Sequence, residues 1–379
     1  MDFQFAPEEE AFRGEVRSFI RTEFPKVRDG ESFTKKLSEK GWLTMSWPVE
    51  YGGQAAGHMR QLVYNEEMAY HRAPGQTMGT DRVGPTIILF GTPEQKAEFL
   101  PKIVRDELNW CQGFSEPGSG SDLASLQTRA VRDGDSYIVN GQKIWTSGAQ
   151  RADYMILLAR TDPDAPKHRG ITYFLLDMKS PGVTVRPLAQ MNGRADFNEV
   201  FFEDVRVPAT AVVGEVNRGW YVSTATLDFE RSGIGRVIGS LRTYEEVVEY
   251  ARTAPSRDDS NATLFSVPSV RHALADIGLS FVVGRLMSYR VAWMQSKQLI
   301  PNYEASMAKT FGTELAQKLA RVAINSVGLG GQLTGGPAAP LSGRIADLYL
   351  STVSLTIAAG TSEINRNIIA QRGLGLPRG

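Results

Sequence analysis

Residues 114–122, Phe-Ser-Glu-Pro-Gly-Ser-Gly-Ser-Asp, form the stretch that decides the fold. Gly118 and Gly120, together with the small hydroxyl side chains beside them, allow backbone amides to close on a ligand, as they do in anion-binding nests. An ordinary glycine- and serine-rich loop has the same composition, so the interpretation needs support from other parts of the chain. Residues 145–148, Trp-Thr-Ser-Gly, and residues 359–363, Ala-Gly-Thr-Ser-Glu, supply that support.

The zone before the first motif, residues 1–110, predicts a helical domain. Pro7 followed by three glutamates is a good helix opening, because acidic side chains suit the positive end of the helix dipole. Thr92-Pro93-Glu94-Gln95 predicts a capping box, so a helix should begin there.

Around the motif, residues 111–216 contain short strand-forming runs separated by turns, which favours a middle antiparallel β-barrel or sheet domain. Asn140-Gly141 lies between two such runs and predicts a hairpin turn. The remaining residues, 217–379, predict a C-terminal four-helix bundle with helices over 217–252, 267–298, 302–328 and 344–372. We therefore expect the α+β class with three domains, 1–110, 111–216 and 217–379.

Composition excludes several classes of protein. The 379 residues exceed what one hydrophobic core usually supports. Lys and Arg (42) balance Asp and Glu (42), which gives no long-range attraction to nucleic acid or to an anionic membrane. A single cysteine, Cys111, allows no internal disulfide and disfavours a structural zinc site. Without a signal-peptide pattern or an apolar run of about 18 residues, we expect no membrane span and a cytoplasmic location.

In their order and separation, the three motifs resemble the acyl-CoA dehydrogenase family of flavoproteins, and the resemblance covers essentially the whole chain. It includes Trp47-Pro48-Val49-Glu50-Tyr51-Gly52-Gly53 and Val205-Arg206-Val207-Pro208. The family implies FAD as cofactor and α,β-dehydrogenation of an acyl-CoA thioester. A carboxylate removes the α-proton, hydrogen bonds to the thioester oxygen stabilise the developing charge, and the β-hydride passes to flavin N5. An electron-transfer flavoprotein is the implied electron acceptor.

The resemblance also implies a set of cofactor contacts. Trp145 would cover one face of the flavin ring, although a half-buried strand aromatic is the commoner role of a lone tryptophan. Ser147 would hydrogen-bond near N5, and Ser115 would meet the ring. The full predicted cofactor-binding set is Gln112, Phe114, Ser115, Gly120, Ser121, Trp145, Thr146, Ser147, Gly360, Thr361 and Glu363.

The position of the catalytic base departs from the commonest family pattern. Many members place Glu directly before the Gly-Thr of the last motif, where this chain has Ala359. A second group places the base on a bundle helix in a Leu-Asp-x-Glu-Arg sequence, and residues 227–231 here read Leu-Asp-Phe-Glu-Arg. Glu230 is therefore the predicted catalytic base, with Ser121, Asp228 and Arg231 as substrate-binding residues. A solvated Glu–Arg pair on a helix face is the ordinary alternative.

A further departure concerns the half of the flavin site that each subunit donates to its neighbour. The usual Arg-x-x-Phe-Gly and Gln are replaced by Arg257-Asp258-Asp259-Ser260-Asn261 and Pro268, and the later Gln and Gly-Gly-x-Gly by Asn325 and residues 328–331. Acidic residues would repel a diphosphate. We expect a tetramer with a homologous subunit, in a mixed α2β2 form, acting on a bulky, branched or steroid side-chain acyl-CoA.

Three alternatives stay open at this stage. The replaced loop could still bind a nucleotide through its backbone. The chain could be a non-catalytic or half-site subunit that completes a partner's flavin site. It could also be a flavoenzyme of the same fold with other chemistry, such as a desulfinase or a nitroalkane-type oxidase.

Overall fold

The computed structural model describes residues 4–377 except 28–29, 232, 257–258 and 260, and the side chains of 30–31 and 228–231 lie outside the description as well. The chain forms two compact units. The helical unit consists of Met1–Val27, Gly57–Pro74 and Arg231–Gly379, and the sheet unit consists of Arg28–Ala56 and Gly75–Glu230. Both units are assembled from separated segments, so the division at residues 110 and 216 stays a prediction.

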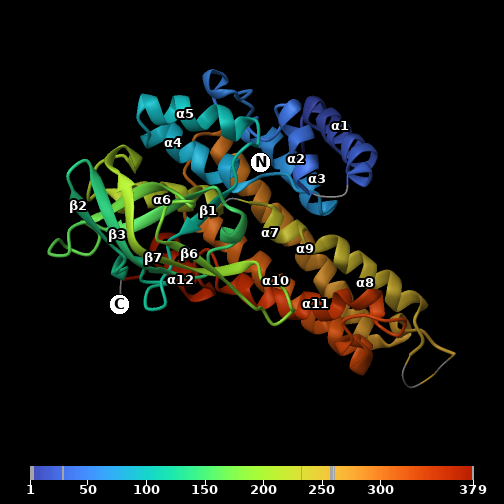
Figure 1. The fold of residues 1–379 in the computed structure, drawn as a ribbon. Helices are drawn as coiled ribbons and strands as arrows, with labels where there is room; N and C mark the ends of the chain where they lie inside the picture. The colour runs from blue at the N-terminus through green and yellow to red at the C-terminus, as the bar shows by residue number, and fades with distance from the viewer. Residues whose placement is uncertain (1–3, 28–29, 232, 257–258, 260, 378–379) are drawn as a thin grey trace. The chain divides into compact units, whose positions relative to one another are not determined.

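The sheet unit is built on an eight-stranded sheet with the order β6-β7-β3-β2-β4-β5-β8, and β1 pairs with β4 (Figure 1). Most neighbouring strands are antiparallel, but β1–β4 and the short β2–β4 contact are parallel, so the sheet is mixed. Its strands are β1 (Trp110–Gly113), β2 (Arg129–Asp133), β3 (Ser136–Lys143), β4 (Tyr154–Arg160), β5 (Ile171–Asp177), β6 (Val183–Leu188), β7 (Phe197–Pro208) and β8 (Val212–Val213).

Strand β4 shows why this segment forms a sheet with two covered faces. Its residues are apolar almost without interruption, as expected for a strand that is buried on both sides. Ile156 and Leu158 enter a core shared with the helices, whereas Met155 and Leu157 enter a core made by the strands. The unit's helices are α2 (Gly30–Glu39), α4 (Gly84–Phe90), α5 (Pro93–Val104) and α6 (Gly219–Arg231).

The predicted capping box is confirmed and the predicted hairpin turn is wrong. Helix α5 begins as expected, because Thr92 Oγ1 accepts the Gln95 amide at 3.3 Å. Strand β3, however, runs straight through Asn140-Gly141, and its pairing with β7 shifts there. A Cβ on Gly141 would lie 2.7 Å from the Cα of Thr128, so this glycine permits a close backbone approach. The actual turn joins β2 to β3 at Gly134, which has φ +62°.

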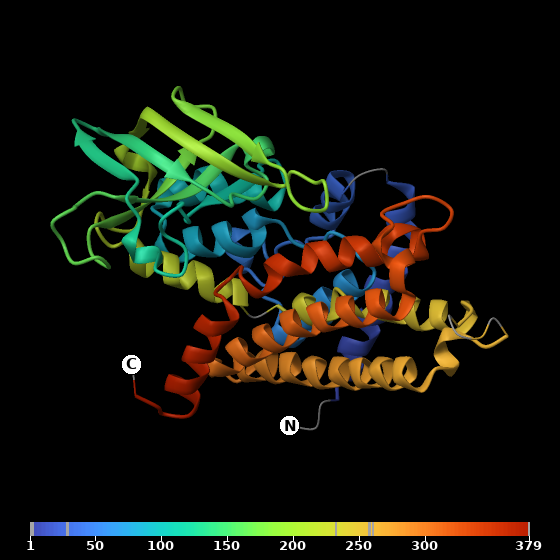
Figure 2. The same cartoon turned by 90° about the horizontal axis from the view of Figure 1, so that it is seen from below.

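The helical unit contains the two longest helices, α9 (Pro268–Ser296) and α10 (Tyr303–Val327), which pack side by side (Figure 2). The remaining helices of this unit are α1 (Pro7–Glu23), α3 (His58–Tyr70), α7 (Gly235–Ile238), α8 (Leu241–Thr253), α11 (Arg344–Ser351) and α12 (Ser362–Ile368). None of the helices in the described part of the chain is long and apolar enough to cross a membrane.

Two of the four predicted bundle helices are broken. The prediction over 217–252 was wrong because α6 ends at Arg231 and α8 begins at Leu241, with glycines between them that lower helix propensity. The prediction over 344–372 was wrong because Ala359 and Gly360 adopt φ +55° and +82°, which no α-helix contains.

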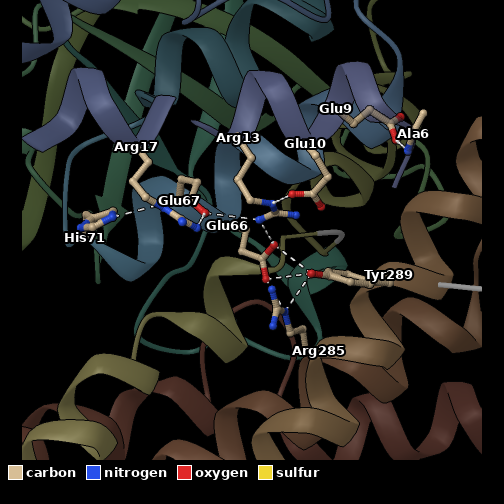
Figure 3. A network of polar contacts seen from close by, with 10 residues as sticks. All are labelled: Ala6, Glu9, Glu10, Arg13, Arg17, Glu66, Glu67, His71, Arg285 and Tyr289. Atoms are coloured by element: carbon tan, nitrogen blue, oxygen red, sulfur yellow. Dashed lines mark hydrogen bonds and ion pairs between the residues drawn. The ribbon is translucent and has the colours of Figure 1, made fainter. Parts of the chain in front are cut away.

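A buried ion-pair network ties α1, α3 and α9 together (Figure 3). Glu66 on α3 accepts from Arg13 at 2.6 Å and from the Tyr289 hydroxyl at 2.9 Å. Arg285 donates to the same carboxylate at 2.5 Å. Because the carboxylate has two cationic partners and a hydroxyl donor, its burial is compensated.

Candidate functional site

The first two motifs lie against each other at the end of β3. The Ile144 amide donates to the Ser115 carbonyl at 2.9 Å, and the Lys143 ammonium donates to the Phe114 carbonyl at 3.0 Å. Trp145 follows directly in the chain. The structure therefore brings the predicted residues 114–115 and 145–147 together, although about thirty positions separate them.

The turn after β3 exposes two of its three predicted residues. Trp145 has φ +60° and is 60% exposed, with its ring edge-on to Phe197 at 6.1 Å. Ser147 is also exposed. Thr146 is completely buried, and its amide and carbonyl both bond to Asn198, at 3.0 and 2.9 Å. Thr146 thus braces a turn that presents Trp145 and Ser147, and its contact with a cofactor stays a prediction.

The glycine-rich loop makes a tight turn and then opens outward. Glu116 and Ser119 exchange two backbone hydrogen bonds, at 2.9 and 3.0 Å. Gly118 and Gly120 are exposed and have open space where a Cβ would stand. Ser121 is exposed as well, so the Gly120–Ser121 pair lies on the rim that a ligand can reach.

Gln112 and Phe114 lie deeper in the sheet unit. The Phe114 ring is 3% exposed and packs edge-on against Tyr173 at 6.1 Å, so its side chain belongs to the core. The side-chain oxygen of Gln112 is buried without a hydrogen-bond partner among the residues that the structure describes. A buried acceptor without a partner is uncommon in native proteins and retains capacity for one more bond.

The third motif lies in the helical unit, on the loop before α12. The buried Lys309 ammonium on α10 donates to the carbonyls of Gly360, at 2.7 Å, and Leu355, at 3.3 Å. Thr361 caps α12 by accepting the Ile364 amide at 3.2 Å. The left-handed turn of the motif is therefore fixed from both sides.

Glu363 lies in the first turn of α12 and is exposed. Its own backbone amide and the Thr361 hydroxyl lower the pKa of its carboxyl group. The side chain stays ionised at neutral pH and makes a favourable contact with the helix N-terminus.

The predicted base and its neighbours fall in a helix whose side chains are outside the description. Asp228, Glu230 and Arg231 belong to α6, but only their backbone is described. The middle of this helix is anchored in the core, since Thr226 Oγ1 lies 2.9 Å from Thr86 Oγ1. The role of Glu230 stays a prediction.

The segment expected to lack a diphosphate grip is described only in part. Arg257, Asp258 and Ser260 lie outside the described residues, while the Asp259 carboxylate accepts the Asn261 amide at 2.9 Å. The expected repulsion therefore stays a prediction.

The helical unit has a cavity of about 680 Å³ at the C-terminal end of α10. Asn325, which replaces the Gln of the family pattern, lines it together with Gly328 and Leu329 from the segment that stands in place of Gly-Gly-x-Gly. Arg321 supplies a positive charge, and Thr334 and Tyr349 supply hydroxyl groups. This lining can accept an anionic or aromatic group, despite the replaced residues.

Two buried lysines were missed by the sequence analysis. Lys143 and Lys309 both donate to carbonyls of the motif loops and are at most 1% exposed. The sequence carries no local signal for either position, because burial of a lysine depends on partners elsewhere in the chain.

Comparison with known proteins agrees with this geometry. Family models for the N-terminal, middle and C-terminal domains of acyl-CoA dehydrogenases match residues 6–107, 111–205 and 217–374. The acyl-CoA dehydrogenase FadE26 of Mycobacterium tuberculosis (strain ATCC 25618 / H37Rv) is 38% identical, covering 100% of this chain and 99% of that protein. The acyl-CoA dehydrogenase IpdE1 of the same strain is 37% identical, covering 97% and 98%.

Two solved structures share the fold along their whole length. The Tcur3481-Tcur3483 steroid ACAD has a TM-score of 0.91 at 33% identity, with 100% of both chains covered. The ChsE4-ChsE5 complex from Mycobacterium tuberculosis has a TM-score of 0.88 at 37% identity, again with 100% of both chains covered.

Proposed function

The chain belongs to the acyl-CoA dehydrogenase family, and from this premise we propose that it binds FAD through the sheet unit and dehydrogenates a bulky acyl-CoA. It is an oxidoreductase that acts on acyl-CoA thioesters. FAD, when bound, supplies the acceptor for the hydride. The exposed Trp145 beside the glycine-rich loop carries the proposal.

Several features of the sheet unit fit a flavin. Trp145 offers an aromatic face to solvent from a left-handed backbone conformation, which is uncommon for residues other than glycine. Gly118 and Gly120 leave space for a ring or a phosphate to approach the backbone. Ser121 and Ser147 place hydroxyl groups on the same exposed loops. Aromatic stacking combined with a few polar groups is typical of cofactor sites.

The proposed roles of the remaining residues follow the family resemblance. Glu230 is the proposed base for the α-proton, because Ala359 has no ionisable group at the alternative position. Asp228, Arg231 and Ser121 are proposed to contact the acyl-CoA. Gly360, Thr361 and Glu363 are proposed to approach the phosphate or ribitol of FAD, with their loop held by Lys309.

We also propose that the chain assembles with a homologous subunit into a tetramer. Helix α9 exposes an apolar stripe at helical spacing: Leu279 (68% exposed), Val282 (56%), Val283 (43%) and Leu286 (37%). Such a stripe on one helix is typical of a surface that is covered by another helix. Both of these solved structures carry the names of two proteins, ChsE4 with ChsE5 and Tcur3481 with Tcur3483. This pairing supports a mixed assembly for this chain. A steroid or other bulky acyl group is the proposed substrate class.

The deciding experiment is anaerobic mixing of the purified protein with a panel of acyl-CoA thioesters that range from straight-chain to steroid. We expect a yellow protein whose flavin absorption bleaches with bulky substrates and recovers with an electron-transfer flavoprotein. A flavin that no acyl-CoA bleaches would refute dehydrogenation. Oxygen consumption without another acceptor would instead indicate an oxidase.

Flavin quantitation after purification from the native host tests the assembly. We expect a cytoplasmic complex with one FAD for every two chains, with an unlike homologue present. Full flavin occupancy in a tetramer of this chain alone would refute the mixed assembly. A colourless chain that turns yellow only with its partner would identify it as the half-site subunit.

A further inference from the structure

Lys143 at the end of β3 is fully buried, at 0% exposure. Its ammonium donates to the Phe114 carbonyl at 3.0 Å and to the Glu116 carboxylate at 2.8 Å. Removing a charged side chain completely from water is strongly unfavourable unless it is paired and hydrogen-bonded. Both partners of Lys143 belong to the first motif, residues 114–122. The bonds that offset the cost of burying the ammonium therefore come from this loop.

Glu116 also ties this loop to the two residues directly before β2. Its carboxylate accepts the backbone amides of Gln127, at 2.7 Å, and Thr128, at 2.9 Å. Burial lowers the pKa of Lys143 to about 8, against the attraction of Glu116. Burial, the largest single cause, would raise the pKa of Glu116, but the charge and hydrogen bond of Lys143 and the hydrogen bonds from Thr128 and Gln127 together lower that pKa. Both groups are therefore charged at neutral pH and close the loop onto β3.

The bond from Lys143 fixes the direction of the next peptide group. In a trans peptide the carbonyl and the amide N–H point in opposite directions. Because the Phe114 carbonyl points inward to Lys143, the Ser115 amide N–H points away from that buried ammonium. The Ser115 carbonyl is in turn held by Ile144, the residue between Lys143 and Trp145. One lysine thus sets both the direction of the Ser115 amide and its position relative to Trp145.

We propose that Lys143 is a positioning residue for the bound flavin, which turns the Ser115 amide toward an acceptor atom of the ring and fixes that amide beside Trp145. The inference rests on the proposed FAD site. It adds a role for a residue that touches neither the cofactor nor the substrate. A lysine that stabilised the sheet alone would bond within the sheet, whereas both acceptors of Lys143 lie in the loop at 114–116.

Residue-resolved amide exchange in the wild-type protein gives the first test. In the apoprotein the Ser115 amide should exchange fast, while the amides of Ile144 and Glu116 should be protected by their carbonyl partners at 2.9 Å. Adding FAD should slow exchange at Ser115 at least about tenfold, as expected for one new hydrogen bond. A Ser115 amide that is already protected without FAD, or is unchanged by it, would overturn the inference.

Substitution separates positioning from simple stabilisation. Lys143→Met alone leaves the Glu116 carboxylate buried without its cation, so loss of folding is expected. Lys143→Met combined with Glu116→Gln removes both charges and keeps an acceptor for one loop amide. In that folded double variant we expect the FAD dissociation constant to rise about tenfold and the visible circular dichroism of the flavin to change. A folded double variant with wild-type affinity and spectrum contradicts the proposal.

The matched control is Arg13→Met combined with Glu66→Gln, which removes a buried ion pair of 2.6 Å from the helical unit (Figure 3). It should lower thermal stability and leave the flavin spectrum unchanged. If the Lys143 double variant does not fold, the exchange experiment on the wild-type protein still tests whether the Ser115 amide bonds to FAD. Amide exchange at Ser115 and the FAD affinity and spectrum can be measured without a substrate. A failure of acyl-CoA to bleach the flavin would therefore refute the proposed dehydrogenation and leave the test of Lys143 intact.

Discussion

Replacing Thr146 by valine should stabilise the apoprotein. The Thr146 side chain is completely buried, and its Oγ1 has no hydrogen-bond partner among the residues that the structure describes. A buried hydroxyl without a partner costs about 1–3 kcal/mol, and valine replaces it with a methyl group of similar size. We therefore expect the free energy of unfolding to rise by about 1–2 kcal/mol. For a cooperative unit of 150–250 residues this corresponds to a Tm increase of roughly 2–8 °C.

Thr172→Val is the matched control, because it removes the same atom from an equally buried threonine of the same unit. The Thr172 hydroxyl is paired with Thr161 Oγ1 at 2.7 Å and accepts the Asn217 amide at 2.8 Å. Without the Thr172 hydroxyl, the Asn217 amide and the Thr161 hydroxyl each lose one hydrogen bond, so Tm should fall by about 4–10 °C. Differential scanning calorimetry of the two apoproteins measures both changes, which have opposite signs.

FAD affinity separates the structural interpretation of Thr146 from the contact predicted from the sequence. If Thr146 only braces the turn, Thr146→Val binds FAD as the wild-type protein does. If its hydroxyl contacts the flavin, the dissociation constant rises about tenfold, as for one lost hydrogen bond. A destabilised apoprotein or a weakened FAD complex would refute a purely bracing role for Thr146.

Three further predictions concern the base, the helical core and the third motif. Glu230→Gln should retain FAD and lose dehydrogenation by about 10²–10⁴-fold in a stopped-flow assay, and wild-type turnover would remove Glu230 from the role of base. Tyr289→Phe should lower the free energy of unfolding by about 2–3 kcal/mol, because the buried Tyr289 hydroxyl donates to Glu66 and accepts from Arg285. Tyr70→Phe is the control and should lower it by less than about 0.5 kcal/mol, because the partner of Tyr70, Glu245, is exposed. Burial and Glu66 raise the pKa of Tyr289 to about 12, so wild-type stability should fall as pH rises from about 10 to 12, a loss that Tyr289→Phe should lack. Gly360→Ala should cost about 1–2 kcal/mol, since φ is +82° there, and an unchanged Tm would contradict a rigid turn.

One fold feature that the sequence predicted correctly depends on a single local interaction. The capping box at Thr92 needs only residues within one helical turn, and it forms as expected. The turn predicted at Asn140-Gly141 failed because a long-range contact decides there. Gly141 lies over Thr128 in the neighbouring chain segment, and β3 continues through it to pair with β7. Local preference for a turn is weaker than the ladder of bonds that β7 provides.

The motif residues were predicted as a set, but the sequence did not tell which of them face outward. Trp145, Thr146 and Ser147 alternate between exposed and buried, and the two hydrogen bonds between Thr146 and Asn198 hold Thr146 on the buried side. Lys143 escaped prediction because burial of a lysine depends on partners elsewhere in the chain, here Glu116. Family motifs record which residues recur near a ligand and do not separate contact from support.

The two buried lysines show how a loop with one open face is held in place. Such a loop cannot be packed on both sides, so its stability depends on bonds from beneath. Lys143 donates to the Phe114 carbonyl, and Lys309 donates to the Gly360 carbonyl in the other unit. A lysine reaches further than a hydroxyl, and its charge makes each bond worth about 1.5–3 kcal/mol. The same arrangement at two motifs that are far apart in the sequence argues that both loops are shaped before any ligand binds.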